Sequence, residues 1–501
     1  MIKQETPARE GERDGRTRMI KAAETLARLD QRPAYSPIVV AGLVRLLDFT
    51  VATAVGFLLH HLYVVPAVGF DIAYAFVIPA IAGLAMLAFE AVDVTHVGAF
   101  RQPVSQGLKL AGAWTIVFLA TLAVIFFAKL DGVFSRVWLA SWFVAGFLGL
   151  LVERGLVALV VRRLTAIGRL ERRTVVVGGG EPAEKLLKDL AAQRHSDVRI
   201  IGVFDDRSDD RAPDVVAGYP KLGSVDDLVE FARYTRVDLV IFALPISAEQ
   251  RLLAMLRKLW VLPIDIRLSA HTAKLQFRPR SYSYIGDVPV LDVFDRPIAD
   301  WGVVVKWAFD KIVGALALAA LSPVLALVAI AVRLDSRGPV FFKQKRYGFN
   351  NELIEVYKFR SMYVDQLDAG AARLVTRDDP RVTRVGRFIR KTSLDELPQL
   401  INVVFKGDLS LVGPRPHAVH AKAADRQYDE VVDGYFARHR VRPGITGWAQ
   451  VNGWRGETDT PEKIQRRVEH DLYYIENWSL AFDVYILMIT PFALIKADNA
   501  Y

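Results

Sequence analysis

The sequence predicts a membrane protein that combines α-helical and α/β parts. Three observations predict this class: long apolar runs, a stretch where short strands alternate with helical patterns, and an arginine-rich region between two later apolar segments. A chain of 501 residues is expected to hold more than one domain. We expect a four-helix transmembrane bundle, a parallel-sheet domain, a re-entrant membrane helix hairpin and a second α/β domain, over residues 36–165, 170–295, 301–335 and 336–501.

Four apolar segments predict the bundle, because each reaches the roughly 20 residues that a spanning helix needs. They cover residues 46–65, 72–92, 108–128 and 137–161. Basic residues precede the first segment and follow the fourth, whereas the loop after the first has none, so both ends are expected in the cytoplasm. Asp48 and Glu90 are expected to face water or partners. Glu153 and Arg154 either pair within the fourth segment or mark its cytoplasmic end.

Composition narrows the range of functions further. Residues 1–35 are polar and charged, which predicts a cytoplasmic tail rather than a signal peptide. The chain has no cysteine, which excludes disulfides and thiolate metal sites. The formal net charge of +9 suits anionic lipids or phosphorylated substrates. No nucleic-acid-binding motif accompanies that charge, so no nucleic-acid partner is expected.

Strands alternate with helices from Arg172 to Val290, which predicts a Rossmann-like parallel sheet. The first expected strand leads into Gly178 and Gly180, which partly match a dinucleotide-binding turn, and the second ends in Asp205. Glycines there also serve simply to turn the chain tightly. Because no Tyr-x-x-x-Lys pair is present, we favour a degenerate, regulatory or structural nucleotide-binding-like domain over cofactor-driven catalysis. Strands are expected at residues 174–177, 199–204, 237–243 and 264–268.

A fifth apolar run, residues 312–332, holds Ser322 and Pro323 in its middle. Proline removes a helix hydrogen bond and bends the axis. Because both flanks are basic, both ends are expected on the cytoplasmic face. A broken helix that enters one leaflet and returns satisfies this, and a kinked spanning helix is the alternative. Residues 478–495 are apolar but interrupted by Asp483, which predicts an interfacial helix.

Two adjacent carboxylates, Asp395 and Glu396, precede a rigid Gly-Pro-Arg-Pro turn that contains Arg415. With Arg387 and Arg390 beside them, they suit phosphoryl chemistry. One acid can attack phosphorus or hold a proton, the other can hold a divalent metal, and arginines can clamp phosphate oxygens. The alternative is a helix start with Ser393 as its cap and the acids in its first turn.

An ordered series of motifs surrounds the acid pair. The motifs are GPVFFKQKRYG at 338–348, YKFRSM at 357–362, TRVGRFIR at 383–390, RPGITGWAQVNG at 442–453 and DLYYIENWS at 471–479. Together with the acid pair and the Gly-Pro-Arg-Pro turn, the series resembles the bacterial sugar transferase family of polyprenyl-phosphate phosphoglycosyl transferases. The likeness covers residue 303 to the C-terminus. The earlier regions are similar, in order and pattern, to larger members that start exopolysaccharide, capsule or O-antigen synthesis.

The resemblance implies a covalent reaction in two steps. Asp395 attacks the β-phosphorus of a UDP-sugar and UMP leaves. Undecaprenyl phosphate then attacks the phospho-sugar on the enzyme, giving undecaprenyl-diphospho-sugar. Glu396 would bind Mg²⁺, which neutralises diphosphate charge. The resemblance also implies a hairpin broken at Ser322 and Pro323.

The resemblance also implies which residues bind phosphate, which partners the protein has and where in the cell it lies. The residues expected near the substrate phosphates are Arg390, Arg415, Arg387, Lys358 and Arg360. The donor sugar is expected to be glucose, with galactose as the alternative. We expect a homodimer in the bacterial inner membrane, in contact with membrane lipids, with its catalytic domain on the cytoplasmic face. Two other classes stay open: a membrane-tethered regulator that uses the Gly178 turn, and a transporter, for which the four helices offer few polar residues.

Overall fold

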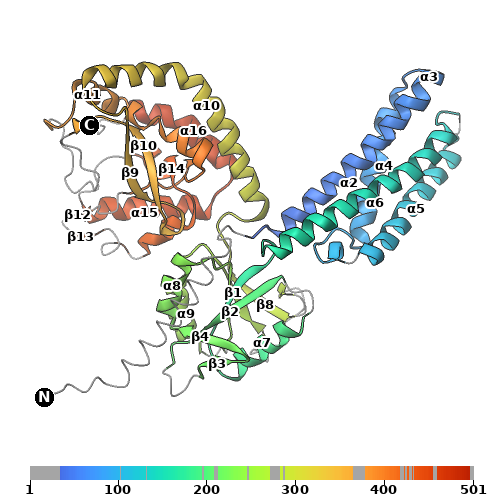
Figure 1. The fold of residues 1–501 in the computed structure, drawn as a ribbon, viewed down its shortest axis with the longest axis horizontal. Coiled ribbons are helices and arrows are strands. Elements are labelled where there is room, and N and C mark those ends of the chain that lie inside the picture. Colours follow the sequence, from blue (N-terminus) through green and yellow to red (C-terminus); the bar gives the residue numbers. More distant parts are fainter. Residues whose placement is uncertain are drawn as a thin grey trace. The chain divides into compact units, whose positions relative to one another are not determined.

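The computed structural model describes residues 34–496, with gaps at 102, 131, 194–196, 208–212, 245–247, 271–282, 286–287, 365–378, 418–421, 424–425, 428–431, 433 and 455–459. The predicted tail therefore lies almost wholly outside the described residues. Contacts group the chain into two compact units. One holds the N-terminal helices, and the other holds the sheet domain and the C-terminal region (Figure 1).

The N-terminal unit is a bundle of long apolar helices that run side by side (Figure 1). They are α2 (Pro37–Leu59), extended by η1 (His60–Val64) and α3 (Val65–Val68), then α4 (Ile72–Ala91), α5 (Pro103–Phe127) and α6 (Arg136–Ala166). Each is long and apolar enough to cross a membrane. The first helix begins nine residues before the predicted segment, because the Ser36 hydroxyl accepts from the N–H groups of Ile38 and Val39. Hydropathy marks the lipid-facing part of a helix, whereas capping chemistry sets its start.

Three buried tryptophans join the helices of this bundle. Trp138 and Trp142 of α6 donate their indole N–H groups to carbonyls of α2, at 3.1 Å to Gly56 and 2.9 Å to Ala52. Trp114 of α5 donates to a carbonyl of α6 at 2.9 Å. Interhelical hydrogen bonds of this kind matter in apolar surroundings, where lipid offers the helices no competing partner.

A cluster of buried charges lies near one end of the bundle. Arg154 contacts Asp48 at 2.8 Å and Glu153 at 3.7 Å, and all three side chains are at most 6% exposed. Asp48 therefore faces a partner rather than water, and Glu153 and Arg154 lie within the helix rather than beyond its end. Glu90 pairs with Arg45 at 3.0 Å in a more exposed position. Two buried carboxylates thus share one guanidinium group.

We expect unequal effects when this cluster is changed. Arg154→Met leaves two buried carboxylates without their cation, and we expect it to lower the free energy of unfolding of the bundle by about 3–5 kcal/mol. Asp48→Asn leaves a one-to-one pair of Glu153 and Arg154, so we expect a loss of less than about 2 kcal/mol. Thermal melting of the full chain in detergent micelles measures both. Equal losses would contradict the idea of a shared cation.

The sheet domain matches the prediction in its centre and departs from it at both edges. Eight strands lie in the order β3-β4-β2-β1-β5-β6-β8-β7. The pairs β2–β4, β1–β5 and β5–β6 are parallel, whereas β3–β4, β6–β8 and β7–β8 are antiparallel. The prediction of a purely parallel sheet was therefore wrong at the edges, where short hairpins follow one another directly. The strands are β1 (Arg172–Val177), β2 (Val198–Phe204), β3 (Val215–Val216), β4 (Tyr219–Gly223), β5 (Leu239–Phe242), β6 (Asp265–Ser269), β7 (Ser283–Ile285) and β8 (Val288–Phe294).

Three helices accompany the sheet and close its core. They are α7 (Glu181–Ala192), α8 (Val225–Tyr234) and α9 (Glu249–Leu259). Ser224 and Asp227 form a capping box that starts α8. The strand β5 is apolar and buried throughout, and β1 ends in three buried valines, as expected for central strands that helices cover on both faces.

The C-terminal region begins with α10 (Asp300–Asp335), which is longer than the predicted apolar run. Figure 1 shows that α10 bends sharply along its length. Pro323 lies inside the helix, and the Ser322 hydroxyl donates to the Ala319 carbonyl at 2.8 Å. Proline is one of the few causes of sharp kinks in helices, and we attribute the bend to Pro323. The arm before it packs with Val403 and Leu411, and the arm after it packs with Phe359 and Ile389.

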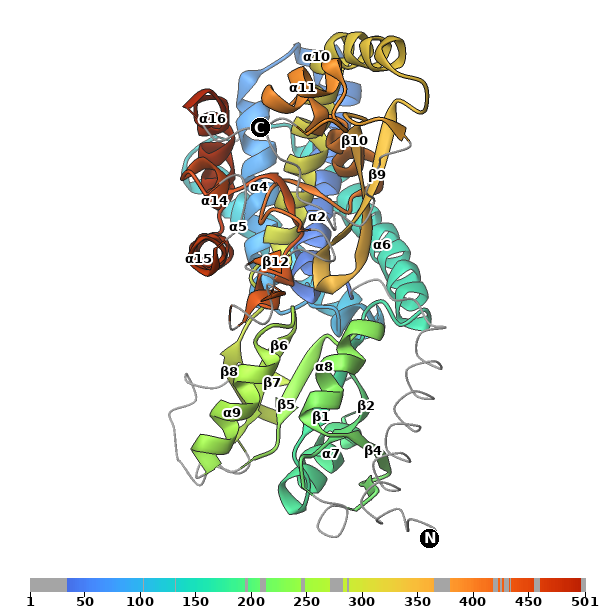
Figure 2. The ribbon, with the colours of Figure 1, turned by 90° about the vertical axis from the view of Figure 1, so that its left-hand side faces the viewer.

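The remaining elements of this region are short, apart from the last two helices. The strands are β9 (Phe341–Tyr347), β10 (Leu353–Phe359), β11 (Ser410–Val412), β12 (Lys422–Ala423), β13 (Arg426–Gln427) and β14 (Gly444–Thr446). The helices are α11 (Arg384–Lys391), α12 (Gln399–Ile401), α14 (Trp448–Val451), α15 (Pro461–Glu476) and α16 (Leu480–Lys496), with turns η7 (Phe349–Asn351), η9 (Leu394–Glu396), η10 (Asn402–Lys406) and η11 (Tyr435–Arg440). Figure 2 shows α14, α15 and α16 together on one side of this region.

Candidate active site

A change of chain direction after α11 presents the acid pair. Thr383 caps the start of α11 by accepting from the Gly386 N–H at 2.9 Å. The helix stops at Lys391, and Ser393 then adopts a left-handed conformation with φ of 60°. Asp395 and Glu396 follow in the single turn η9. The alternative prediction, a helix start with Ser393 as its cap and the acids in its first turn, is right in position, because Ser393 directly precedes η9 and both acids lie in that turn. The Ser393 side chain makes no capping hydrogen bond to it.

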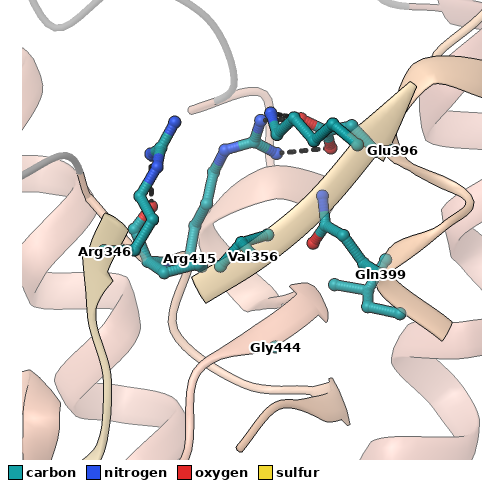
Figure 3. A pocket seen from close by; sticks show the side chains of 9 residues that line it. Arg346, Val356, Glu396, Gln399, Arg415 and Gly444 are labelled. Carbon is teal, nitrogen blue, oxygen red and sulfur yellow. Dashed lines mark hydrogen bonds and ion pairs between the residues drawn. The ribbon is translucent and has the colours of Figure 1, made fainter. Parts of the chain in front are cut away.

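The acids lie beside a small pocket that several segments build. Its lining residues are Arg346, Val356, Lys358, Glu396, Gln399, Arg415, Pro416, Gly444 and Ile445. Figure 3 shows the Arg415 side chain reaching across to Glu396, with Arg346 beside it. The hairpin β9–β10 supplies one wall, and the turn after β11 and the strand β14 supply another. Cations therefore surround one acid of the pair.

Glu396 is held by two cations. Lys358 Nζ lies 2.8 Å from Glu396 Oε1. Arg415 grips the carboxylate with two nitrogens, Nη2 at 2.6 Å from Oε1 and Nη1 at 3.3 Å from Oε2. A two-point grip fixes direction as well as distance, and the same fork fits a phosphate group. The arrangement can exchange one anion for another with little movement of the chain.

Asp395 differs from its neighbour in protonation. Burial and, to a lesser degree, the charge of Glu396 raise the pKa of Asp395 to about 6, against the opposing charges of Lys358, Arg390 and Arg415. Burial also lowers the pKa of Lys358, although Glu396 opposes that shift. A carboxyl with a pKa near 6 is ionised at neutral pH and loses its charge in mild acid. It is available as a nucleophile or a base under ordinary conditions.

The turn that carries Arg415 is fixed by close backbone contact between two motifs. The strands β11 and β14 are parallel, and the Gly413 N–H donates to the Thr446 carbonyl at 2.9 Å. The Gly444 N–H donates back to the Pro414 carbonyl at 2.9 Å. A Cβ on Gly444 would lie 2.0 Å from the Gly413 nitrogen, so a side chain has no room there. The PGITG motif thus supplies the glycine that lets the two strands meet.

A buried polar network supports the turn from behind. Arg438 is 1% exposed and donates to the Arg415 carbonyl at 2.7 Å and to Asp471 Oδ2 at 2.6 Å. His417 also contacts this guanidinium, and burial together with Arg438 lowers the pKa of His417 well below its usual value. The sequence reasoning missed Arg438 and His417. Asp471 opens a quoted motif, but only the fold shows its partner.

The other predicted site residues fall in different places. Arg387 is exposed on α11, and Arg390 of the same helix lies close enough to Asp395 to affect its pKa. Arg360 is buried and donates to the carbonyls of Ser336 and Arg337, so it fixes the end of α10 and does not line the pocket. The structure therefore brings together Asp395, Glu396, Lys358, Arg390 and Arg415. Arg360 stays outside this group because its guanidinium is used by the helix end.

The donor set permits a magnesium ion only with help from a substrate. Within the described residues, no group of three or more His, Cys, Asp and Glu side chains could hold a metal by itself. Mg²⁺ commonly binds one or two carboxylates together with substrate phosphate oxygens and water. Asp395 and Glu396 fit that smaller requirement.

The turn after β1 is tight and has charged residues of both signs around it. Gly178 and Gly180 have φ values of 108° and 80°, as a tight turn requires. The buried Asp205 carboxylate lies against this turn, since a Cβ on Gly179 would be 2.4 Å from its Oδ2. Asp205 is paired with Arg251 at 3.6 Å and with Arg207 at 3.9 Å. The degenerate, regulatory or structural interpretation of this domain stays a prediction.

Sequence comparisons connect these features to known proteins. Residues 301–497 match the bacterial sugar transferase family, and residues 90–270 match a CoA-binding domain. The UDP-glucose:undecaprenyl-phosphate glucose-1-phosphate transferase of Escherichia coli is 37% identical over 388 residues, which are 77% of this chain and 81% of that protein. The chain belongs to the bacterial sugar transferase family. The resemblance inferred from the motifs is confirmed, and the protein is an enzyme of the phosphotransferase kind.

Two further relatives show the range of names within this family. An undecaprenyl-phosphate glucose phosphotransferase of Komagataeibacter xylinus is 41% identical over 361 residues, and the match spans 70% of this chain but 64% of that protein. The undecaprenyl-phosphate galactose phosphotransferase of Salmonella typhimurium is 29% identical over 427 residues, 80% of this chain and 84% of that protein. Similar chains in this bacterial sugar transferase family thus carry names with different sugars.

We expect the buried guanidinium of Arg438 to be hard to replace. Arg438→Lys keeps the charge but cannot contact Asp471, His417 and the Arg415 carbonyl at once, so about 1–3 kcal/mol of stability should be lost. The control is Arg466→Lys on α15, where an exposed arginine pairs with Glu469 at 3.0 Å. A change below about 0.5 kcal/mol is expected there. Thermal melting compares the two, and equal shifts would show that the network does not support the turn.

Proposed function

We propose that the protein transfers a hexose 1-phosphate from a UDP-sugar to undecaprenyl phosphate, releasing UMP and forming an undecaprenyl-diphospho-sugar. The observation that carries this proposal is the adjacent pair Asp395 and Glu396 beside Lys358 and Arg415. An acid of raised pKa among fixed cations suits phosphoryl transfer, which depends on positioning and charge neutralisation. The relatives' names supply the classes of donor and acceptor.

The reaction would proceed through a covalent intermediate on Asp395. A carboxylate oxygen of Asp395 attacks the β-phosphorus of the donor, and the bond from that phosphorus to the UMP oxygen breaks. A phosphate oxygen of the lipid acceptor then attacks the same phosphorus, and the bond to Asp395 breaks. A carboxylate nucleophile divides one transfer between two bulky anions into two easier steps. The half-buried Asp395 has the pKa that this role needs at neutral pH.

Lys358 and Arg415 would change partners when the donor binds. Each now pairs with Glu396, at 2.8 and 2.6 Å. Phosphate oxygens entering the pocket would replace the Glu396 carboxylate beside these two cations. Glu396 would then be released to hold Mg²⁺. The ion supplies neutralisation of the diphosphate charge when it is bound. Arg390 and Arg387 on α11 would contribute positive charge around the entering donor.

The sugar is proposed to be glucose, because the relatives at 41% and 37% identity carry glucose in their names. Galactose is the alternative, from the relative at 29% identity. The reaction would be the first membrane step in the synthesis of an exopolysaccharide, capsule or O-antigen.

The bend in α10 supports a cytoplasmic active site. Its two arms pack against different parts of the same C-terminal region, through Val313 before Pro323 and Val328 after it. A helix that returned to the same face would hold Asp395 at the boundary where a lipid phosphate and a soluble nucleotide can meet. We therefore place the protein in the bacterial inner membrane with its active site inside. A homodimer stays a prediction.

The deciding experiment is UMP release by the purified full chain with undecaprenyl phosphate, Mg²⁺ and a panel of UDP-sugars. Wild-type protein is expected to release UMP with UDP-glucose, and Asp395→Asn is expected to lose at least about 1,000-fold of the rate, because the nucleophile is absent. The control is Asp408→Asn, a carboxylate outside the pocket. Near-full turnover by Asp395→Asn would refute the covalent mechanism, whereas no UMP from the wild type with any donor of the panel would favour the membrane-tethered regulator.

The raised pKa of Asp395 predicts a pH profile. Only the carboxylate attacks, so kcat/KM should rise as pH increases through about 6 and level off above. Exchange of labelled UMP into the UDP-sugar, without acceptor, avoids titration of the lipid phosphate. Glu396→Gln removes a neighbouring negative charge, so any remaining exchange should show its inflection at lower pH. An inflection that stays in place would exclude Asp395 as the titrating group.

The hairpin predicts where cysteines can be labelled. The chain has no cysteine of its own, so single cysteines at Ala299, Ser336 and Gly69 can be introduced cleanly. In spheroplasts, an impermeant maleimide should reach position 69 and miss 299 and 336. With Ser322 and Pro323 both changed to alanine, α10 should straighten and expose position 336. Continued protection there would mean that this pair does not set the hairpin.

A further inference from the structure

A buried ion pair joins the membrane helix α10 to the strand that leads to Arg415. Lys306 Nζ of α10 lies 2.7 Å from Asp483 Oδ2 of α16 and donates to the Val412 carbonyl at 3.0 Å. Lys306 is 9% exposed and Asp483 is completely buried. Neither residue lines the pocket beside Glu396. The proposed reaction therefore assigns no role to Lys306 and Asp483.

Two further side chains complete the surroundings of Asp483. The Tyr474 hydroxyl lies 2.7 Å from Asp483 Oδ1 and 3.0 Å from the same Val412 carbonyl, and the Trp478 indole N–H donates to Asp483 Oδ2 at 3.2 Å. Burial, with the charge of Asp483, raises the pKa of Tyr474 well above its usual value, so the hydroxyl keeps its proton. The carboxylate thus accepts from donors of α10, of α15 and of the segment between α15 and α16.

The same helix grips the rest of β11. Asp310 lies one turn after Lys306 and accepts from the Ser410 hydroxyl at 3.0 Å and from the Leu411 N–H at 3.1 Å. All three residues of β11 therefore bond to charged side chains of α10. Val412 is followed after two residues by Arg415, so the height of β11 on α10 determines where the guanidinium of Arg415 lies.

A buried ion pair of this kind is better suited to fixing the alignment of β11 on α10 than to raising the free energy of unfolding. Buried ion pairs are often replaced by apolar residues without loss of stability, and their best-attested use is to select one alignment. An apolar contact tolerates sliding along the helix axis, whereas Lys306 must reach the Val412 carbonyl and the Asp483 carboxylate at once, while also pairing with Asp310 of its own helix at 3.4 Å. Meanwhile α10 exposes Leu316, Leu327 and Ile330, which suit lipid and would set its depth.

We propose that Lys306 and Asp483 are positioning residues that fix Arg415 at a set height on the membrane helix. Through this link, the depth of α10 in the lipid determines the height of the Arg415 guanidinium, so that the guanidinium lies at the level of the lipid phosphate. This inference rests on the proposed function, because it assigns Arg415 to the phosphates of that reaction. Tyr474 strengthens the same link through its bond to Val412.

The test compares Lys306→Met, Asp483→Asn and Tyr474→Phe with the wild type in nanodiscs, using UDP-glucose and undecaprenyl phosphate. Misplacing a clamp by about 1 Å costs up to roughly a hundredfold in rate, so kcat for Lys306→Met should fall about tenfold to a hundredfold. The donor KM should stay within about twofold, because the loss falls on the transition state. Tyr474→Phe, which keeps its ring, should lose about threefold to tenfold.

Lys311→Met is the matched control. Lys311 also lies on α10 and donates to backbone carbonyls, those of Val403 and Val404, but not to β11. Its kcat per folded protein should stay within about twofold of the wild type even if its melting temperature falls. An equal loss for Lys311→Met, or an unchanged kcat for Lys306→Met and Tyr474→Phe, would overturn the positioning role alone. No UMP from the wild type would overturn the proposed function and this inference with it.

Discussion

The ion pair between Arg415 and Glu396 is the interaction on which the site depends. It joins a turn after β11 to the single turn η9, through nitrogen–oxygen distances of 2.6 and 3.3 Å. Without this cation, two adjacent carboxylates would repel each other in a half-buried place. The pair thus keeps the acids together while leaving Asp395 with a pKa near 6. The same guanidinium that neutralises Glu396 in the free protein has the shape to grip phosphate.

Much of the C-terminal region serves to place that one guanidinium. Arg438 and Asp471 hold the Arg415 carbonyl from behind, and the glycine contact between β11 and β14 fixes the turn. The charged side chains of α10 hold β11 from the membrane side. These supports come from different parts of the chain and are all buried, so water and salt cannot readily weaken them. In the proposed reaction, a guanidinium fixed in this way would need little rearrangement as charge develops at phosphorus.

The N-terminal unit also holds buried charged groups, and it compensates them by pairing. Its helices are apolar almost throughout, and buried polar groups inside include the charges around Arg154 and the indole N–H groups that donate to carbonyls of neighbouring helices. Charges inside a helical bundle are tolerated when they are paired. The sheet domain follows the same rule, since the buried Asp205 carboxylate beside the glycine turn is paired with Arg251 at 3.6 Å and with Arg207 at 3.9 Å.

The sequence by itself determined the order of the regions, the apolar helices, the central parallel strands and the acid pair with its Lys358, Arg390 and Arg415. These follow from local patterns: hydropathy, alternation of strands and helices, and motif order. Only the tertiary structure decided that Arg360 supports the end of α10, that Asp48 pairs with Arg154, and that Arg438 and Lys306 hold the clamp. These side chains meet partners far away in the chain. Local sequence patterns do not predict such long-range contacts, because these contacts form only when separate elements pack against one another.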